Sequence, residues 1–284
     1  MTTAAPTSAL SQPGGAPAGL PPVGKQRATL RRSLLAEWTK LRSVRSSFVT
    51  MLVTVVVTVG LGALITSAFV SRWDHLGRRE RLEFDPTSFS LNGIFLGQLA
   101  IAVLGVLIVT SEFSSGMIRT TFAAMPRRPL VVVAKATVFA AVTLVVATVT
   151  SFAAFLIGQV VLSQQNLGVS LSDPSVLRAV IGGGLYLTLV GLFGLGFGAI
   201  LRHTAGAISA VVGVLLVLPI IAHFLPGNLG TDVNKFLPSQ AGSAIMNVRP
   251  VSESLAPWSG LGMFCLYTVV VLVVGGVLLS RRDV

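Results

Sequence analysis

Few residues of this 284-residue sequence are placed to do chemistry, and the segment nearest to a catalytic motif is GLPPVGKQ, residues 19–26. A phosphate-binding loop reads GxxxxGK followed by Ser or Thr, whose hydroxyl binds magnesium. Gln26 cannot supply that hydroxyl, and Pro21 and Pro22 lack backbone N–H groups that would hold the phosphates. No apolar strand precedes the segment. We therefore expect this chain to bind no ATP, so that any ATP hydrolysis coupled to it takes place in another chain.

The candidates for a catalytic nucleophile and its base are Ser243, His203 and His223. The two histidines lie 20 positions apart, and at about 1.5 Å per residue of helix they cannot share a site. No recognised nucleophile motif surrounds Ser243. The single cysteine, Cys265, excludes an intramolecular disulfide and a cysteine metal cluster. We therefore expect neither a catalytic site nor a metal site.

The elements that position the remaining residues are long apolar helices. Hydrophobic residues make up 52% of the chain and charged residues 11%, less than half the roughly 25% of soluble domains. Six runs are long enough to cross about 30 Å of hydrocarbon, and none contains Asp, Glu, Lys or Arg. They are Phe48–Val70, Ser90–Thr110, Ala136–Leu162, Ala179–Leu201, Ala205–Leu225 and Gly260–Ser280. The sequence therefore predicts an all-α integral membrane protein with six transmembrane helices.

The fourth and fifth runs are the hardest to separate, because only Arg202, His203 and Thr204 lie between them. We interpret these residues as a tight turn between antiparallel helices. One long re-entrant element is the alternative.

The basic residues predict the orientation of the spans. With the N-terminus inside, the inner segments hold 14 of the 21 Lys and Arg residues and the outer segments hold seven. Because Lys and Arg beside the spans are enriched on the cytoplasmic side, we expect both termini in the cytoplasm of a plasma-membrane protein. The net charge of +11, which in a soluble chain would suggest nucleic acid, here indicates topology and no nucleic-acid partner.

Two cytoplasmic regions precede the first span. Residues 1–27 are rich in Pro and Gly and are expected to form a disordered tail. Residues 28–47 carry an apolar stripe that includes Leu34, Trp38 and Leu41, with basic residues over much of the remaining surface. This pattern predicts an interfacial amphipathic helix in the headgroup layer of the inner leaflet. A simple topology anchor is the alternative.

A second cytoplasmic element, residues 111–135, joins the second and third spans. Phe113, Ile118 and Phe122 can share one face of a short helix that ends before Pro126. Such an element can dock a soluble partner or lie on lipid, and an ordinary positive-inside loop is the alternative.

Small residues in two spans predict close helix packing. Gly93 and Gly97 form one G-x-x-x-G pair, and Gly194 and Gly198 form another. The pattern does not distinguish packing within one subunit from packing across a dimer.

Three stretches, in this order, carry a family resemblance: AEWTKLRSVRSSF at 36–48, TSEFSSGMIRTTFAAMPRRPLVVVAK at 110–135 and KFLPSQAGSAI at 235–245. Residues 30–284 resemble an ABC-2 type permease, the membrane subunit of ATP-binding-cassette (ABC) exporters, in the form common in actinobacteria. The resemblance implies that the chain has no ATPase domain and binds no cofactor, and that ATP and magnesium are bound by a separate ABC ATPase subunit. It also implies a second permease subunit, in a homodimer or a heterodimer.

The resemblance implies roles for three groups of residues. The segment between the second and third spans resembles the helix that couples ATPase closure to the membrane, through Glu112, Phe113, Gly116, Arg119, Pro126, Arg128 and Lys135. The helix before the first span resembles the connecting helix that abuts the ATPase, with Glu37, Trp38, Lys40 and Arg42. The outer segment, residues 226–259, is expected to form a cap or gate, with Leu237, Pro238, Ser239 and Gly242.

These features predict the permease subunit of an ABC exporter. The spans contain no charged residue, which disfavours ion-coupled transport and favours an apolar or amphipathic substrate. A membrane scaffold or regulatory subunit without transport is the alternative function, and an integral membrane enzyme is less favoured.

Overall fold

The computed structural model describes residues 30–43, 45–118, 128–226, 229–249, 251 and 254–281. Within these residues the chain is helical and contains no strand. Six segments are long and apolar enough to cross a membrane: Phe48–Val70, Pro86–Ser114, Leu130–Ser163, Pro174–Leu201, Thr204–His223 and Pro257–Arg281. This finding confirms the predicted all-α fold class with six candidate spans. The tail predicted at residues 1–27 lies outside the described residues.

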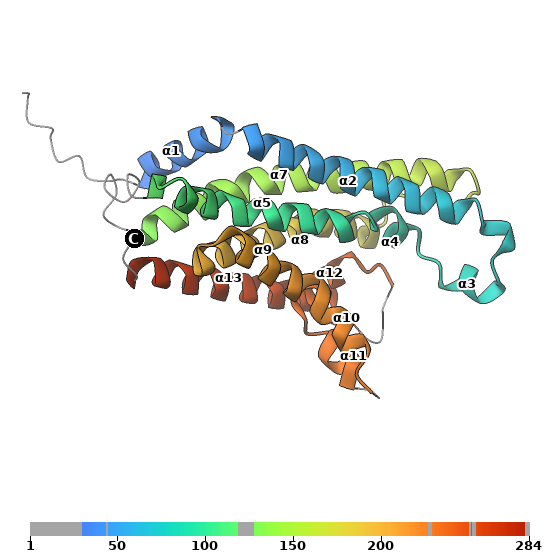
Figure 1. Cartoon of the computed structure of the whole chain (residues 1–284). Coiled ribbons are helices and arrows are strands. Elements are labelled where there is room, and N and C mark those ends of the chain that lie inside the picture. Colours follow the sequence, from blue (N-terminus) through green and yellow to red (C-terminus); the bar gives the residue numbers. More distant parts are fainter. Residues whose placement is uncertain are drawn as a thin grey trace, which may run out of the picture.

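The spans lie side by side in one elongated bundle, which runs from left to right in Figure 1. In chain order, the helices that build it are α1 (Leu30–Ser43), α2 (Arg45–Val70), α4 (Pro86–Leu91), α5 (Ile94–Ser114), α7 (Arg128–Ser163), α8 (Pro174–Leu201), α9 (Thr204–Val212), α10 (Leu218–His223) and α13 (Pro257–Arg281). Helix α1 and the last turn of α13 lie at one end of the bundle, here named the α1 end. The short helices α3 (Arg78–Glu83), α11 (Leu229–Asn234) and α12 (Pro238–Ser243) lie toward the opposite end, here named the α12 end.

The third span begins earlier than the apolar run that predicted it. That run started at Ala136 because Lys135 interrupts it, whereas helix α7 starts at Arg128 and continues through the lysine. Proline in the first turn of a helix is compatible with this start, because the first N–H groups have no partner within the helix. Lys135 therefore lies on a span helix and not in a loop.

The fourth and fifth spans are two helices joined by a tight turn, as predicted. Arg202 ends α8 in the left-handed conformation, with φ of 55°. His203 then caps α9, since its Nδ1 accepts a hydrogen bond from the backbone N–H of Gly206 at 3.3 Å. Ending one helix and capping the next within two residues reverses the chain direction, which excludes one continuous re-entrant element.

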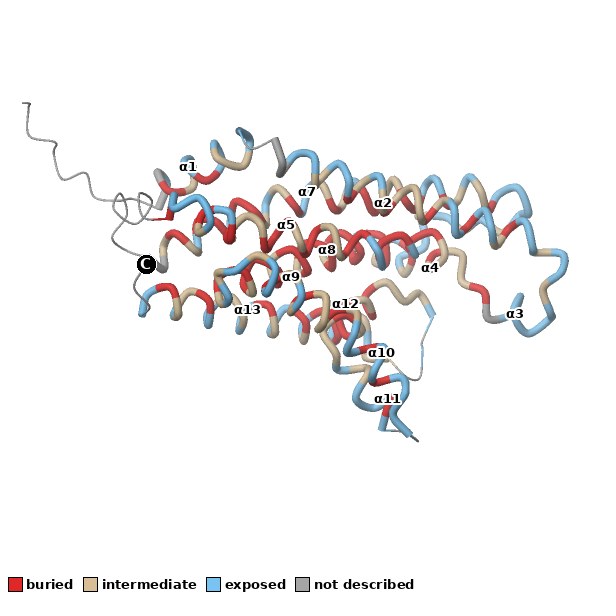
Figure 2. Tube along the Cα trace, viewed as in Figure 1, coloured by how far each residue is buried: buried red, intermediate tan, exposed pale blue. Residues whose placement is uncertain are grey.

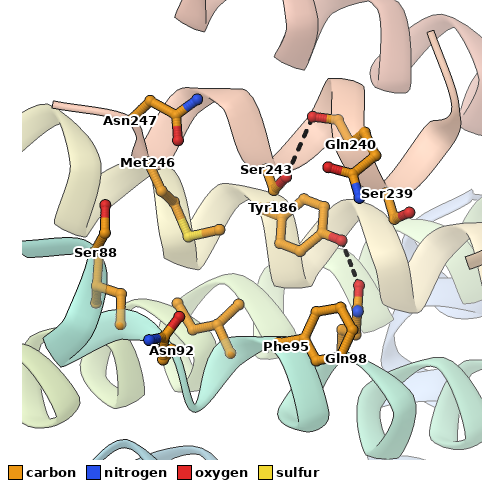
Figure 3. A pocket seen from close by; sticks show the side chains of 12 residues that line it. Ser88, Asn92, Phe95, Gln98, Tyr186, Ser239, Gln240, Ser243, Met246 and Asn247 are labelled. Atoms are coloured by element: carbon orange, nitrogen blue, oxygen red, sulfur yellow. Dashed lines mark hydrogen bonds between the residues drawn. The ribbon is translucent and has the colours of Figure 1, made fainter. Parts of the chain in front are cut away.

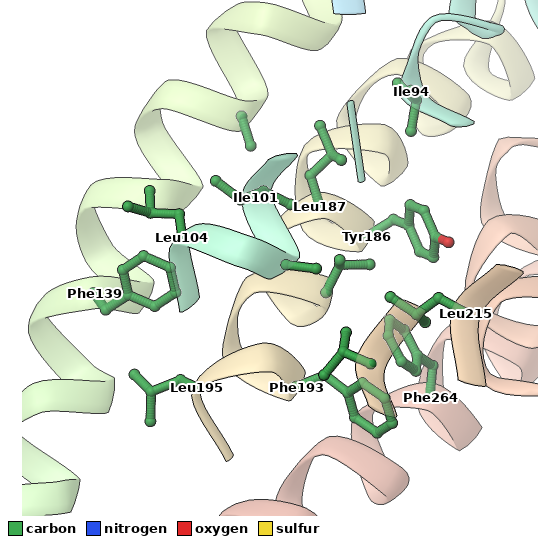
Figure 4. Close-up of a cluster of buried hydrophobic side chains, with 14 of the residues drawn as sticks. Ile94, Ile101, Leu104, Phe139, Tyr186, Leu187, Phe193, Leu195, Leu215 and Phe264 are labelled. Atoms are coloured by element: carbon green, nitrogen blue, oxygen red, sulfur yellow. The ribbon is translucent and has the colours of Figure 1, made fainter. Parts of the chain in front are cut away.

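The core of the bundle lies between α5 and α8. These two helices are the most deeply buried spans, whereas α2 and α13 are mostly exposed (Figure 2). Large side chains that include Phe139, Tyr186 and Phe264 fill the spaces around the pair (Figure 4). The two backbones come very close, because a Cβ added to Gly194 would overlap the carbonyl oxygen of Ala102. This pair of glycine-containing helices is thus packed within one chain.

The fifth span is irregular. A π-helical turn, Gly213–Val217, separates α9 from α10, and Pro219 lies in the first turn of α10. Proline cannot donate a backbone hydrogen bond, which favours a break in the regular helix at this point. Helices α10 and α11 lean away from the bundle at the α12 end (Figure 1).

Candidate functional site

Four charged side chains from three helices meet at the α1 end of the bundle, and we name them the charge cluster. Glu37 and Lys40 lie three residues apart on α1, Glu112 lies near the end of α5, and Lys135 is the eighth residue of α7. Residues three apart on a helix share a face, so α1 presents both of its charges to the same place. Glu37, Glu112 and Lys135 are buried, and Lys40 is half-buried. The cluster contains two carboxylates and two ammonium groups and is therefore electrically neutral.

Each lysine of the charge cluster bridges both glutamates. Lys135 Nζ lies 2.7 Å from Glu37 Oε2 and 2.8 Å from Glu112 Oε1. Lys40 Nζ lies 3.0 Å from Glu37 Oε1 and 3.0 Å from Glu112 Oε1. Taking one ion out of water costs several kcal/mol, and this arrangement offsets that cost because every charge has two partners of opposite sign. The cluster consequently holds α1, α5 and α7 in one register.

The electrostatics of the cluster keep its half-buried lysine, Lys40, charged. Burial by itself lowers the pKa of Lys40, but the hydrogen bond and negative charge of Glu37, together with the charge of Glu112, raise it above its ordinary value of 10.5. One acceptor in the cluster is unused, because Glu112 Oε2 is buried and receives no hydrogen bond from any residue that the structure describes. The arrangement can therefore take one further donor without losing an existing contact.

A second contact at the same end joins α5 to α8 and α13. The guanidinium of Arg202 lies over the ring of Phe113, 5.3 Å from its centroid. The same guanidinium donates a hydrogen bond of 3.0 Å to the carbonyl oxygen of Leu278. Cation–π and hydrogen-bond contacts of this kind fix the relative positions of helix ends. With the charge cluster, this contact links the α1 ends of five helices.

Comparison with known proteins places the sequence in a family. The sequence model described as ABC-2 family transporter protein matches residues 33–196, more than half of the chain. The chain belongs to the ABC-2 transporter family. No curated protein matches the sequence. The matched region contains all four residues of the charge cluster. Because the membrane proteins of this family lack an ATPase domain, membership of the family generally implies an ABC ATPase partner.

Of the residues predicted to couple this ABC-2 chain to an ATPase, the structure brings Glu112 and Lys135 into contact. They stand on either side of the segment that joins α5 to α7, 2.8 Å apart. Gly116 follows the end of α5 with φ of 71°, a left-handed conformation that glycine adopts without strain. Arg128 is the first residue of α7. Arg119 and Pro126 lie outside the described residues.

The helix predicted to lie in the headgroup layer is α1, and its residues divide between two faces. Glu37 and Lys40 turn toward the bundle, whereas Trp38, with 49% of its surface exposed, and Arg42 turn away from it. A glutamate and a lysine of this helix meet charges from two spans, a contact that was not predicted from the sequence. The missed signal was the presence of Glu112 and Lys135 at the edges of otherwise uncharged runs, since buried charges require partners.

The predicted outer residues lie on and beside α12, which packs against α13 and α8. Leu237 precedes the helix and Pro238 occupies its first position. Ser239 and Gly242 are buried, and a Cβ on Gly242 would lie within 2.7 Å of the rings of Phe264 and Tyr186. These residues therefore fold into the α12 end of the bundle.

The nucleophile and base candidates do not form a catalytic pair. Ser243 Oγ donates to the carbonyl oxygen of Gln240 at 3.2 Å, and His203 caps α9. In the described part of the chain no hydrogen bond joins Ser243 to either His203 or His223. Among all residues that the structure describes, no group of three His, Cys, Asp or Glu side chains could hold a metal ion.

Proposed function

We propose that this chain is the permease subunit of an ABC exporter and that the charge cluster carries the motion of the ATPase into the membrane. The observation that supports this function is the contact between Glu112 and Lys135, at the two ends of the α5–α7 connection, together with their shared contacts to α1. A partner that pushes on this connection must move α5 or α7, and through the cluster it must move α1 as well.

The mechanism follows from the way the helices pack. Helix α5 lies against α8 along the core, and α8 lies against α7 and α13. Closely packed cores transmit a displacement instead of absorbing it, because they have few voids. Closure of two ATPase subunits would therefore shift α5 and α7 together and open the α12 end of the bundle. This is an alternating-access mechanism driven from the α1 end.

The orientation and the partners form part of the same proposal. The excess of basic residues in the inner segments of the sequence favours cytoplasmic termini, in a plasma-membrane protein whose ATPase docks beneath α1 and the α5–α7 connection. Exposed apolar side chains on α2, among them Phe48, Val56 and Leu64, face lipid or a second permease subunit. ATP and magnesium would be bound by the ATPase. The likeness to the actinobacterial form of the family stays a prediction, and no step of the proposed mechanism depends on it.

The test is reconstitution with the ATPase. The chain is co-expressed with a candidate ABC ATPase, purified in nanodiscs, and assayed for complex formation and ATP turnover. We expect the wild-type chain to bind the ATPase and change its turnover, and Glu112→Gln to keep binding but lose most of that change. The matched control is Lys235→Ala, which removes an exposed ion pair with Asp232 at the α12 end.

Two outcomes would contradict the proposal. If the wild-type chain neither binds an ATPase nor alters its turnover, the exporter function is wrong. If Glu112→Gln and Lys235→Ala leave the change in turnover equally intact, the charge cluster has no role in coupling. Binding without any effect on turnover would favour the alternative, a scaffold or regulatory subunit.

A further inference from the structure

A cavity of about 200 Å³ lies near the α12 end of the bundle, away from the charge cluster, and both apolar and polar side chains line it. Its walls come from α4, the start of α5, the middle of α8, helix α12 and the residues that follow α12 (Figure 3). Its polar lining includes the side chains of Gln98, Tyr186, Ser239 and Gln240. Pockets for drug-sized molecules span about 300–1,000 Å³, so this cavity has room for a headgroup and not for a larger molecule.

One buried polar group of this cavity lacks a partner. Ser239 Oγ is buried, with no hydrogen-bond partner in the described part of the chain, and the whole residue is only 5% exposed. Beside it, the phenol of Tyr186 donates to Gln98 Oε1, and both of these side chains line the cavity. Buried polar groups are nearly always paired, so an unpaired hydroxyl that lines a cavity indicates that something else binds there.

The lining residues determine which chemistry can bind. None of them is Asp, Glu, Lys, Arg or His, so a formal charge in the cavity would have no partner of opposite sign. The polar side chains are amides and hydroxyls, which supply both hydrogen-bond donors and acceptors. Such a lining matches an uncharged group that itself carries hydroxyls or amides, and it disfavours a phosphate or an ammonium.

One wall of the cavity reaches the surface of the span. Phe95 lines the cavity and is 53% exposed, and the neighbouring Leu96 is 40% exposed. Both lie on α5 within the second candidate span, Pro86–Ser114. An apolar chain attached to the bound headgroup can therefore continue along this face without entering the cavity.

We propose that this cavity binds the uncharged, hydroxyl- or amide-bearing headgroup of an amphipathic molecule whose apolar chain lies along Phe95 and Leu96. This inference rests on the proposed exporter function for its meaning, because it names the class of substrate that the permease would move. The binding itself requires no ATPase and is measured without one.

The experiment measures lipid retention by the purified chain. Three sets of phosphatidylcholine nanodiscs each contain one further lipid at the same low concentration: monoglucosyl dioleoylglycerol, dioleoylglycerol or phosphatidylglycerol. The chain is then extracted into a zwitterionic detergent, and the lipid that stays bound to it is counted by native mass spectrometry. We expect the glucosyl lipid to be retained over the other two. Ser239→Ala and Gln98→Leu should each reduce that retention by roughly threefold to tenfold, since each removes one hydrogen bond to the headgroup.

Controls separate binding from folding. Ser67→Ala removes an exposed hydroxyl that bonds only to the carbonyl oxygen of Leu64, and it should leave retention unchanged. Ser239→Ala removes a hydroxyl without a described partner, so its melting temperature in phosphatidylcholine alone should not fall. Free methyl glucoside should not displace the lipid at equal concentration, because it has no apolar chain.

Several results would overturn the inference. Equal retention of all three lipids, or retention that neither Ser239→Ala nor Gln98→Leu reduces, would mean that the cavity holds only water. Displacement by methyl glucoside at equal concentration would overturn the role of Phe95 and Leu96. If the chain retains the glucosyl lipid selectively but engages no ATPase, the binding site is supported and the exporter function is wrong. If the chain couples to an ATPase but retains no lipid selectively, this inference alone is wrong.

Discussion

Replacing Lys135 by Met is the most direct perturbation of the charge cluster. Met fills a similar length of space but carries no charge, and it leaves Glu37 and Glu112 buried with Lys40 as their shared partner. Removing one partner of a buried ion pair costs about 3–5 kcal/mol. Because Lys40 still contacts both carboxylates at 3.0 Å, we expect the lower end of that range, about 3 kcal/mol, or roughly a hundredfold in the unfolding equilibrium.

A double-mutant cycle gives this magnitude a specific test. Glu112→Gln in the Lys135→Met background restores a neutral cluster, with one carboxylate and one ammonium. The double variant should therefore be more stable than the sum of the two single losses, by about 1–3 kcal/mol. The free energy of unfolding is measured by denaturant titration in mixed micelles, with helix content followed by circular dichroism.

The exposed pair Asp232 and Lys235 supplies the control cycle, since its atoms lie 2.7 Å apart with the aspartate side chain 63% exposed. Exposed pairs contribute about 0.2–1 kcal/mol, so Lys235→Met should cost far less than Lys135→Met. If Lys235→Met and Lys135→Met lower the free energy of unfolding equally, the ions of the cluster are no more strongly paired than an exposed pair. If the effects of Lys135→Met and Glu112→Gln are additive, these two residues are not coupled.

Three further predictions follow from single positions. Gly116→Ala should lower the free energy of unfolding by about 1–2 kcal/mol, measured by thermal unfolding, and Gly116→Asn should lower it by less. The reason is that φ of 71°, and not a lack of space, restricts this position, and equal effects of the two substitutions would contradict it. Gly194→Ala should cost about 1–3 kcal/mol, whereas Gly276→Ala, with no atom within 4 Å of its Cβ, should not lower the melting temperature. A lysine whose pKa is raised on folding contributes stability that is complete below the unfolded pKa and is lost as pH rises through the folded one. The stability that Lys40 contributes should therefore be constant from pH 6 to pH 9 and decline above about 10.5, and a Lys40→Met penalty that shrinks between pH 6 and pH 9 would count against this assignment.

The six spans could be predicted from the sequence because the constraint that creates them is local. A run of about 20 apolar residues in lipid must satisfy its own backbone hydrogen bonds, and the helix is the structure that does so within one segment. The beginning of the third span was predicted less well. Lys135 set the beginning of the predicted run at Ala136, but a buried ion pair with Glu112 lets the helix include the lysine.

Packing partners needed the tertiary structure. The G-x-x-x-G pairs were visible in the sequence, but their packing partners were not. The spacing shows that one face of a helix carries only small residues, and it does not show which helix packs against that face. In the structure the Gly194 face lies against Ala102 on α5, and the Gly93 face lies against Thr58 on α2. Both contacts are made within one chain.

The residues of the charge cluster were identified from the sequence in two separate local patterns, one before the first span and one between the second and third. Their meeting was not visible there. Lys40 contacts Glu112 across 72 positions and Lys135 contacts Glu37 across 98, and no local periodicity encodes contacts at such separations. The register of α1, α5 and α7 decides them, and that register depends on how the side chains of the whole bundle fill the space between the helices. The sequence by itself thus determined that the chain forms six helices long and apolar enough to cross a membrane, whereas only the tertiary structure decided that four charges from three helices form one neutral, largely buried cluster.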